Sequence, residues 1–213
     1  MKKLLLLLSI SLAFIGSANA NSIEGAFGYK LGQVVKSVPI EIIKHGGFRF
    51  AFNASRDFAP QKPLPGLDKY SFNVTPITKK IYSIIGHGYE ASSARIPCDT
   101  LGFDGDSDFA IIKSMLEAKY GDFKEFQNEE YNELSPDGNN SLRFTKEFQL
   151  NDGDKSINLY CKYTSQHFEN LDSKISYHLM LKYTDNKLDK LDNKEGDELE
   201  KKLINEKSSD YDI

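Results

Sequence analysis

The stretch LRFTKEFQLNDGDKSINLYCKYT at residues 142–164, continued by ISYHLMLKY at residues 175–183, decides the fold of this chain. Apolar and polar residues alternate in three successive runs, which is the period-two pattern of half-buried β-strands. Asp152 and Gly153 separate the first two runs, and an Asp-Gly pair tolerates the positive φ angles of a tight hairpin. We therefore predict an antiparallel three-strand meander with one dry face and one wet face.

The two cysteines are predicted to connect this meander to the segment before the strongest helix pattern. Cys161 lies on the dry face of the middle strand, and Cys98 precedes the helix. A disulfide between them would close a loop whose chain-entropy contribution is about 4 kcal/mol. Two buried free thiols are the alternative.

Residues 1–20 have the features of a cleaved signal peptide. Lys2 and Lys3 precede an apolar run from Leu4 to Ile15, and Ala18-Asn19-Ala20 is a small-x-small cleavage pattern. The style is typical of bacteria, and no cysteine follows the site, which disfavours a lipoprotein. We expect a mature chain that begins near Asn21 and is periplasmic or secreted, with an uncleaved anchor as the alternative.

Composition narrows the classes of protein and partner. The chain is 39% hydrophobic and 12% aromatic, as globular proteins are, and its formal net charge is -4. An acidic balance disfavours nucleic acid as a partner. No segment after the signal is apolar enough to predict a membrane span. We expect one globular domain over residues 21–184.

The remaining patterns predict an α+β fold, in which an antiparallel sheet carries one long and one short helix on one face. The sheet would combine the C-terminal meander with N-terminal hairpins. The short helix, a hairpin, a proline-rich surface loop, two strands and the long helix are expected at residues 31–37, 40–52, 54–69, 70–89 and 108–120. Because a helix precedes several strands twice, a pseudo-repeat is possible.

Residues 185–213 differ from the rest of the chain because they are dense in charged residues. Leu199 and Leu203 fit one marginal amphipathic helix, and Gly196 is expected to interrupt any longer one. We predict a charged tail that is partly disordered or marginally helical. A helix that folds on contact with a partner is the alternative.

Signatures of catalysis are weak. The chain has no Gly-x-Ser-x-Gly elbow, no His-Glu-x-x-His pair and no Cys-x-x-Cys pair. His87 is the most noticeable histidine, because Gly86 and Gly88 flank it within a predicted strand and indicate a bulge or a close backbone approach. The other histidines, which are isolated in sequence and expected in turns or at the surface, are His45, His167 and His178.

Asp104, Asp106 and Asp108 resemble the start of a calcium-binding loop. Phe109 stands where that loop needs glycine, and Met115 where it needs the bidentate glutamate. The predicted role is therefore capping of the helix that follows, with a metal site as the weaker hypothesis. The glycine-rich residues 25–32 lack the ending and spacing of a phosphate loop and predict a turn. No cofactor is predicted.

These observations favour an exported, non-catalytic binding or adaptor protein. Tyr160, Tyr177 or Tyr183, depending on register, would lie on a sheet face that contacts an envelope or secreted protein, since tyrosine combines a large contact area with a polar end. The alternative is a hydrolase with an unrecognised site where His87 meets a carboxylate.

Overall fold

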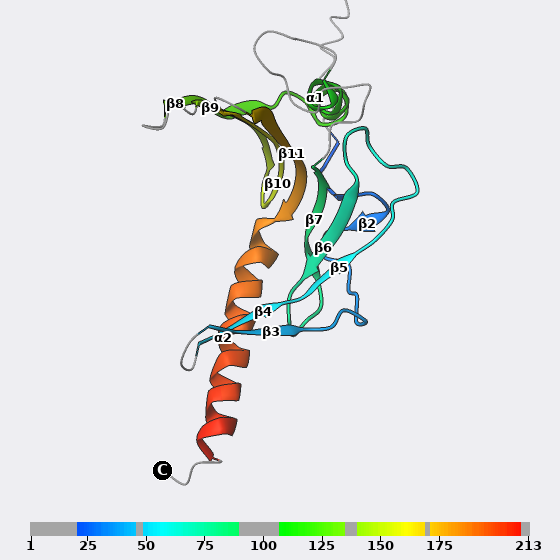
Figure 1. Ribbon diagram of the computed structural model, residues 1–213. Helices are drawn as coiled ribbons and strands as arrows, with labels where there is room; N and C mark the ends of the chain where they lie inside the picture. Colours follow the sequence, from blue (N-terminus) through cyan, green and yellow to red (C-terminus); the bar gives the residue numbers. More distant parts are fainter. Residues whose placement is uncertain (1–20, 46–48, 90–106, 135–139, 169–170, 210–213) are drawn as a thin grey trace, which may run out of the picture.

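The computed structural model describes residues 21–45, 49–89, 107–134, 140–168 and 171–209. Its main feature is a seven-stranded antiparallel sheet in the order β5-β6-β7-β11-β10-β9-β8 (Figure 1). These strands are β5 Ser55–Asp57, β6 Lys69–Val74, β7 Ile81–Gly88, β8 Lys124–Leu134, β9 Asn140–Asp152, β10 Lys155–Phe168 and β11 Leu171–Asp185. Two small sheets pair β1 Gly25–Ala26 with β2 Tyr29–Lys30, and β3 Glu41–His45 with β4 Arg49–Asn53. The two helices are α1 Asp108–Tyr120 and α2 Asn186–Ser209.

The predicted meander is confirmed as β9, β10 and β11. Leu159 on β10 pairs with Phe148 on β9 and with Leu181 on β11. All three side chains are buried, on the face of the sheet that we call the inner face. The opposite, outer face carries Tyr160 and its register partner Met180, which are only partly buried.

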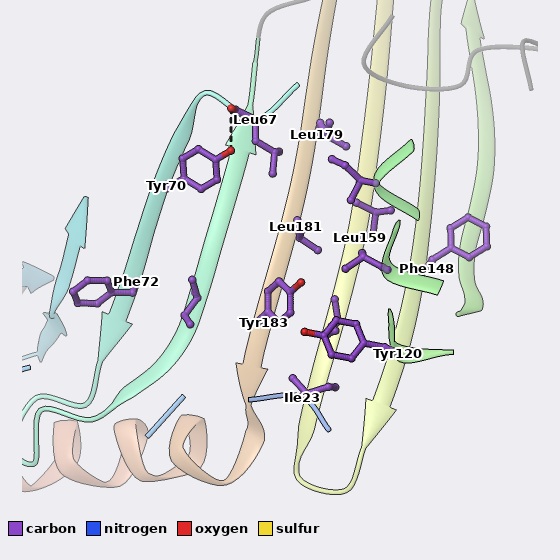
Figure 2. Close-up of a cluster of buried hydrophobic side chains, with 14 of the residues drawn as sticks. Ile23, Leu67, Tyr70, Phe72, Tyr120, Phe148, Leu159, Leu179, Leu181 and Tyr183 are labelled. Atoms are coloured by element: carbon purple, nitrogen blue, oxygen red, sulfur yellow. Dashed lines mark hydrogen bonds between the residues drawn. The ribbon is translucent and has the colours of Figure 1, made fainter. Parts of the chain in front are cut away.

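The predicted long helix is α1, and it covers the inner face. Phe109, Ile112, Leu116 and Tyr120 recur at helical spacing and are all buried. Figure 2 shows Tyr120 and Phe148 beside Leu159 within this cluster of buried side chains. Ser107 caps the first turn by accepting a hydrogen bond from the amide nitrogen of Ala110 at 3.0 Å.

The predicted short helix at residues 31–37 is absent, and this part of the prediction is wrong. Gly32 takes a φ of 81°, which ends any helical run there. The amides of Gly32 and Val35 donate to the carbonyls of Ile81 and Lys79, both at 2.8 Å, instead of to a preceding turn. The proposed pseudo-repeat therefore gains no support from the described residues.

β8 and β5 were not predicted as strands, and neither were β1 and β2, where only a turn was expected. β8 is an edge strand of mostly polar residues, so it lacks the alternation that marks a half-buried strand. A register shift between Glu125 and Gln127 leaves Phe126 68% exposed. β5 is only three residues long and lies at the start of residues 54–69, for which a proline-rich loop was predicted. Tertiary pairing, not local pattern, produces β8 and β5.

α2 is a helix of 24 residues. The C-terminal segment, predicted to be partly disordered or marginally helical, is therefore helical over a longer stretch than expected. Gly196 lies inside α2 and does not interrupt it, contrary to expectation. A Cβ at Gly196 would lie 3.8 Å from the ring of Phe52, an ordinary van der Waals contact, so α2 lies against β4 here without requiring glycine. The α2 helix runs on from the end of β11 and crosses the β3–β4 hairpin (Figure 1). Neither helix is long and apolar enough to cross a membrane.

Candidate functional site

The tight turn between β1 and β2 forms one wall of an apolar cavity. Its two central residues, Phe27 and Gly28, have φ angles of 55° and 92°. Positive φ is costly for a bulky residue, on the order of 1–3 kcal/mol. The Phe27 ring makes edge contacts with Tyr70 at 4.8 Å and Tyr183 at 6.3 Å between centroids, which hold it over the sheet.

The proline-rich loop forms a second wall, and Tyr70 on β6 holds it. The Tyr70 hydroxyl accepts a hydrogen bond from the Leu64 amide at 2.9 Å and lies 3.2 Å from the Leu67 carbonyl, to which it donates (Figure 2). The loop also lies directly against β7, because a Cβ built on Gly88 would be 1.7 Å from the carbonyl oxygen of Gly66. The close backbone approach predicted from the glycines around His87 is thus confirmed.

The third wall is α1, and the floor is Tyr183 on β11. Together these walls enclose a cavity of about 360 Å³, within the range of small-molecule sites. Its apolar lining comes mainly from Phe27, Leu64, Ile112, Met115, Leu116 and Tyr183. Among the described residues that line it, Lys62 and Lys119 are the only charged ones, and both are exposed.

The floor of the cavity stays uncharged across the biological pH range. Burial raises the pKa of the Tyr183 hydroxyl, and the neighbouring Tyr120 raises it further. Burial also raises the pKa of Tyr70. Since neither phenol ionises, the charge at the cavity is that of its two lysines. The arrangement suits an apolar group that carries a negative charge at one end.

No family model, curated protein or solved structure matches this chain. A function must therefore be argued from the site, because a sheet-and-helix architecture by itself does not determine one.

His87 lies away from this cavity, on the outer face. Its Nδ1 is 3.1 Å from Nε2 of His178, a pairing of two histidines that no sequence pattern predicted. Among the described residues no carboxylate hydrogen-bonds to either ring, as the hydrolase hypothesis would require. The side chains of His45 and His167 lie outside the described part of the chain.

The tyrosines that were alternatives for a recognition face, Tyr160, Tyr177 and Tyr183, are divided between the two faces of the sheet. Tyr160 is on the outer face and lies edge-on to His178, with centroids 5.6 Å apart. Tyr183 is buried in the core of the inner face, and the partly buried Tyr177 packs against that core. The strands that carry these tyrosines were predicted, but the sequence alone left open which tyrosine would lie on which face, because that depends on strand register.

The proposed calcium site and disulfide fall partly outside the described residues, which exclude Asp104, Asp106 and Cys98. Asp108 is buried in the first turn of α1, against Gly66. Within the described ranges no group of three or more His, Cys, Asp or Glu side chains could hold a metal ion. Cys161 is 1% exposed and is not a free thiol, while its pairing with Cys98 stays a prediction.

Sequence reasoning missed the cavity, although two signals were present. The glycines on either side of Phe27 mark a turn that can hold an aromatic ring at positive φ. Met115 is an apolar residue that lies outside the helical spacing of the residues predicted to be buried. Neither signal says that the turn, the proline-rich loop and α1 meet, because residues far apart in sequence form these contacts.

Proposed function

We propose that this protein is an exported, non-catalytic binding protein that holds an amphiphilic anion in the cavity beside α1. The observation that carries the proposal is an apolar cavity of about 360 Å³ whose charged lining, among the described residues, consists of two lysines. Burial of an apolar chain supplies affinity, at about 25 cal/mol per Å² removed from water. The lysines supply a preference for a carboxylate, phosphate or sulfonate end.

The walls of the cavity are preorganised, which supports a ligand-binding role for the cavity and not a mere packing defect. Phe27 is held by two aromatic contacts, and the proline-rich loop by the Tyr70 hydroxyl. A ligand would therefore meet walls that need little ordering, and ordering is a large part of the free-energy cost of binding. Met115, exposed at the cavity, offers a flexible and polarizable side chain that adapts to ligand shape.

The test uses 1-anilinonaphthalene-8-sulfonate, an apolar probe with one sulfonate, added to the purified mature protein. We expect saturable fluorescence enhancement with one site per chain. Decanoate should displace the probe at a concentration at least ten-fold lower than decanol does, because only decanoate offers an anion to Lys62 and Lys119. Equal displacement by the two would remove the assignment of an anion.

Matched variants localise the site. Met115→Glu places a like charge beside the anion and should weaken probe binding at least ten-fold. Ser114→Glu adds the same charge to an exposed neighbour that does not line the cavity, and should leave binding within two-fold. The double variant Lys62→Gln/Lys119→Gln should lose the preference for decanoate, whereas Lys187→Gln on α2 should keep it. If Met115→Glu binds the probe like the native protein, this cavity is not the site.

A further inference from the structure

The outer face of the sheet carries a second cluster, which the proposed function does not use. His87 on β7 is the register partner of Met180 on β11, and His178 lies two residues before Met180 on the same strand. Residues two apart on a strand share a face, and direct cross-strand partners have Cβ atoms about 5 Å apart. Two imidazoles and one thioether are therefore gathered on one face.

The two imidazoles meet edge to edge. Nδ1 of His87 and Nε2 of His178 are 3.1 Å apart, while the ring centroids are 5.4 Å apart and the ring planes are within 16° of each other. The centroid separation exceeds the nitrogen separation by about two ring radii, so both nitrogens lie on the line between the centroids. Their lone-pair directions converge on a single point, where one shared proton makes the hydrogen bond.

Tyr89 covers this pair. Its ring is within 6° of parallel to His178 and 16° of parallel to His87, at centroid distances of 4.9 Å and 5.7 Å. Tyr89 is 47% exposed, so it lies at the surface beside the pair and not in the core. Lys69 Nζ lies 5.4 Å from the Tyr89 centroid, which adds a positive charge at the edge of the cluster.

Both imidazoles are in the neutral form that binds metals. Burial lowers the pKa of His87, and the neighbouring His178 and Lys69 lower it further against the opposing effect of Asp68. Burial and Lys162 lower the pKa of His178. The nearby ammonium groups disfavour a divalent cation, and among the described residues no set of His, Cys, Asp and Glu is available to hold one.

We propose that His87, His178 and Met180 form a binding site for Cu(I). Imidazole and thioether ligands together select soft metal ions, and Cu(I) carries a single charge. The ion would take the place of the proton shared by the two rings, that proton would move to the other nitrogen of the ring that donates it so that both imidazoles stay neutral, and Met180 would be the third ligand. Metal–nitrogen bonds of about 2 Å each need the two nitrogens to be about 4 Å apart on a line, so the rings must separate by about 1 Å. This site is independent of the cavity beside α1.

The test is an anaerobic titration of the purified mature protein with Cu(I), in competition with the chromophoric chelator bicinchoninate. We expect one Cu(I) per chain, held with a dissociation constant below 1 μM. Imidazole nitrogen resonances of His87 and His178 and the methyl resonance of Met180 should shift together in the NMR spectrum. Zn(II) should bind at least ten-fold more weakly, since it gains little from a thioether.

Variants separate this site from adventitious binding. Met180→Leu keeps the volume and removes the sulfur, and should weaken Cu(I) binding at least ten-fold. Met115→Leu makes the same change in the cavity and should have no effect. His87→Gln and His178→Gln should each abolish stoichiometric binding. Failure of the protein to compete with bicinchoninate, or equal affinity for Cu(I) in Met180→Leu and native protein, would overturn the assignment.

Discussion

Asp192 and Glu195 lie one turn apart on α2, yet the pKa of one carboxyl is raised and that of the other is lowered. Burial disfavours the charged form of both. Glu195 overcomes this effect, because its Oε2 accepts hydrogen bonds from the amides of Ile77 at 2.7 Å and Thr78 at 2.9 Å, and its Oε1 from the Thr78 hydroxyl at 2.7 Å. Asp192 has the Tyr82 hydroxyl as a partner but also faces the charges of Asp189 and Glu195, and its pKa rises to about 6. Glu195 thus attaches α2 to the turn after β6, whereas the ionised carboxylate of Asp192 destabilises the folded protein.

Glu195→Ala should destabilise the protein by about 2–4 kcal/mol, because two backbone amides in a partly buried turn lose their acceptor. Denaturant unfolding at pH 7 measures the effect. Glu198→Ala removes an exposed carboxylate from the same helix and should change stability by less than about 0.5 kcal/mol. Because the folded-state pKa of Glu195 is below its ordinary 4.5, its stabilisation is present above pH 4.5 and is lost as pH falls. Equal effects of the two substitutions would contradict this role for Glu195.

Asp192→Asn should stabilise the protein, whereas Glu195→Ala should destabilise it. The folded-state pKa of Asp192, about 6, is above its ordinary 3.8, so the ionised carboxyl opposes folding at neutral pH and the opposition disappears below pH 3.8. The asparagine oxygen can still accept from Tyr82. We expect Asp192→Asn to stabilise the protein by about 1–2 kcal/mol at pH 7.5, and the gain to shrink towards zero as pH falls from 6 to 4. Thermal melts across that range test the trend, and a gain independent of pH would argue against ionisation as its cause.

Gly88→Ala should be strongly destabilising, since its Cβ would stand 1.7 Å from a backbone oxygen of the proline-rich loop. We expect a loss of more than about 2 kcal/mol, as the loop must move. Gly153→Ala is the matched control: φ is 59° there, but nothing lies within 4 Å, so the cost is about 1 kcal/mol. Probe binding in the cavity should weaken in Gly88→Ala alone, because the displaced loop carries Leu64.

Cys161 should pair with Cys98. Thiol titration of denatured, unreduced mature protein is expected to find almost no free thiol. Reduction, or Cys161→Ser, should then cost about 4 kcal/mol, as expected for a loop of this length. Peptide mapping without reduction would identify the linked pair. Two reactive thiols per chain would show that the disulfide is absent.

Much of the sheet could be predicted because local residue patterns identify its strands. The alternation of apolar and polar residues in β9, β10 and β11 reflects one buried face, and the spacing of Phe109, Ile112, Leu116 and Tyr120 reflects the buried side of α1. The same logic fails for β8, whose solvent-exposed edge position removes the need for alternation. It also fails for residues 31–37, where long-range pairing with β7 outweighs a weak local helix pattern.

The candidate sites were harder to predict than the strands. The cavity depends on three segments meeting, and the histidine pair depends on which residue of β7 faces which residue of β11. A shift of one residue would turn His87 to the inner face. Likewise, α2 looked like a solvated tail because its attachments are charged: Glu195 and Glu200 hold backbone amides, and no apolar pattern reveals such bonds.

Ile23 is fully buried, although it is only the third residue after the cleavage point predicted after Ala20. The amide of Asn21 donates to the carbonyl of Lys119 at the end of α1, and that of Ile23 to Asp152. A peptidase that cuts after Ala20 needs an extended peptide on both sides of the bond, which the packed Ile23 does not provide. If the leader is removed there, the cut must come before Ile23 enters the core. Cleavage at that bond would then have to precede the packing of residues 21–23 against the end of α1 and against Asp152.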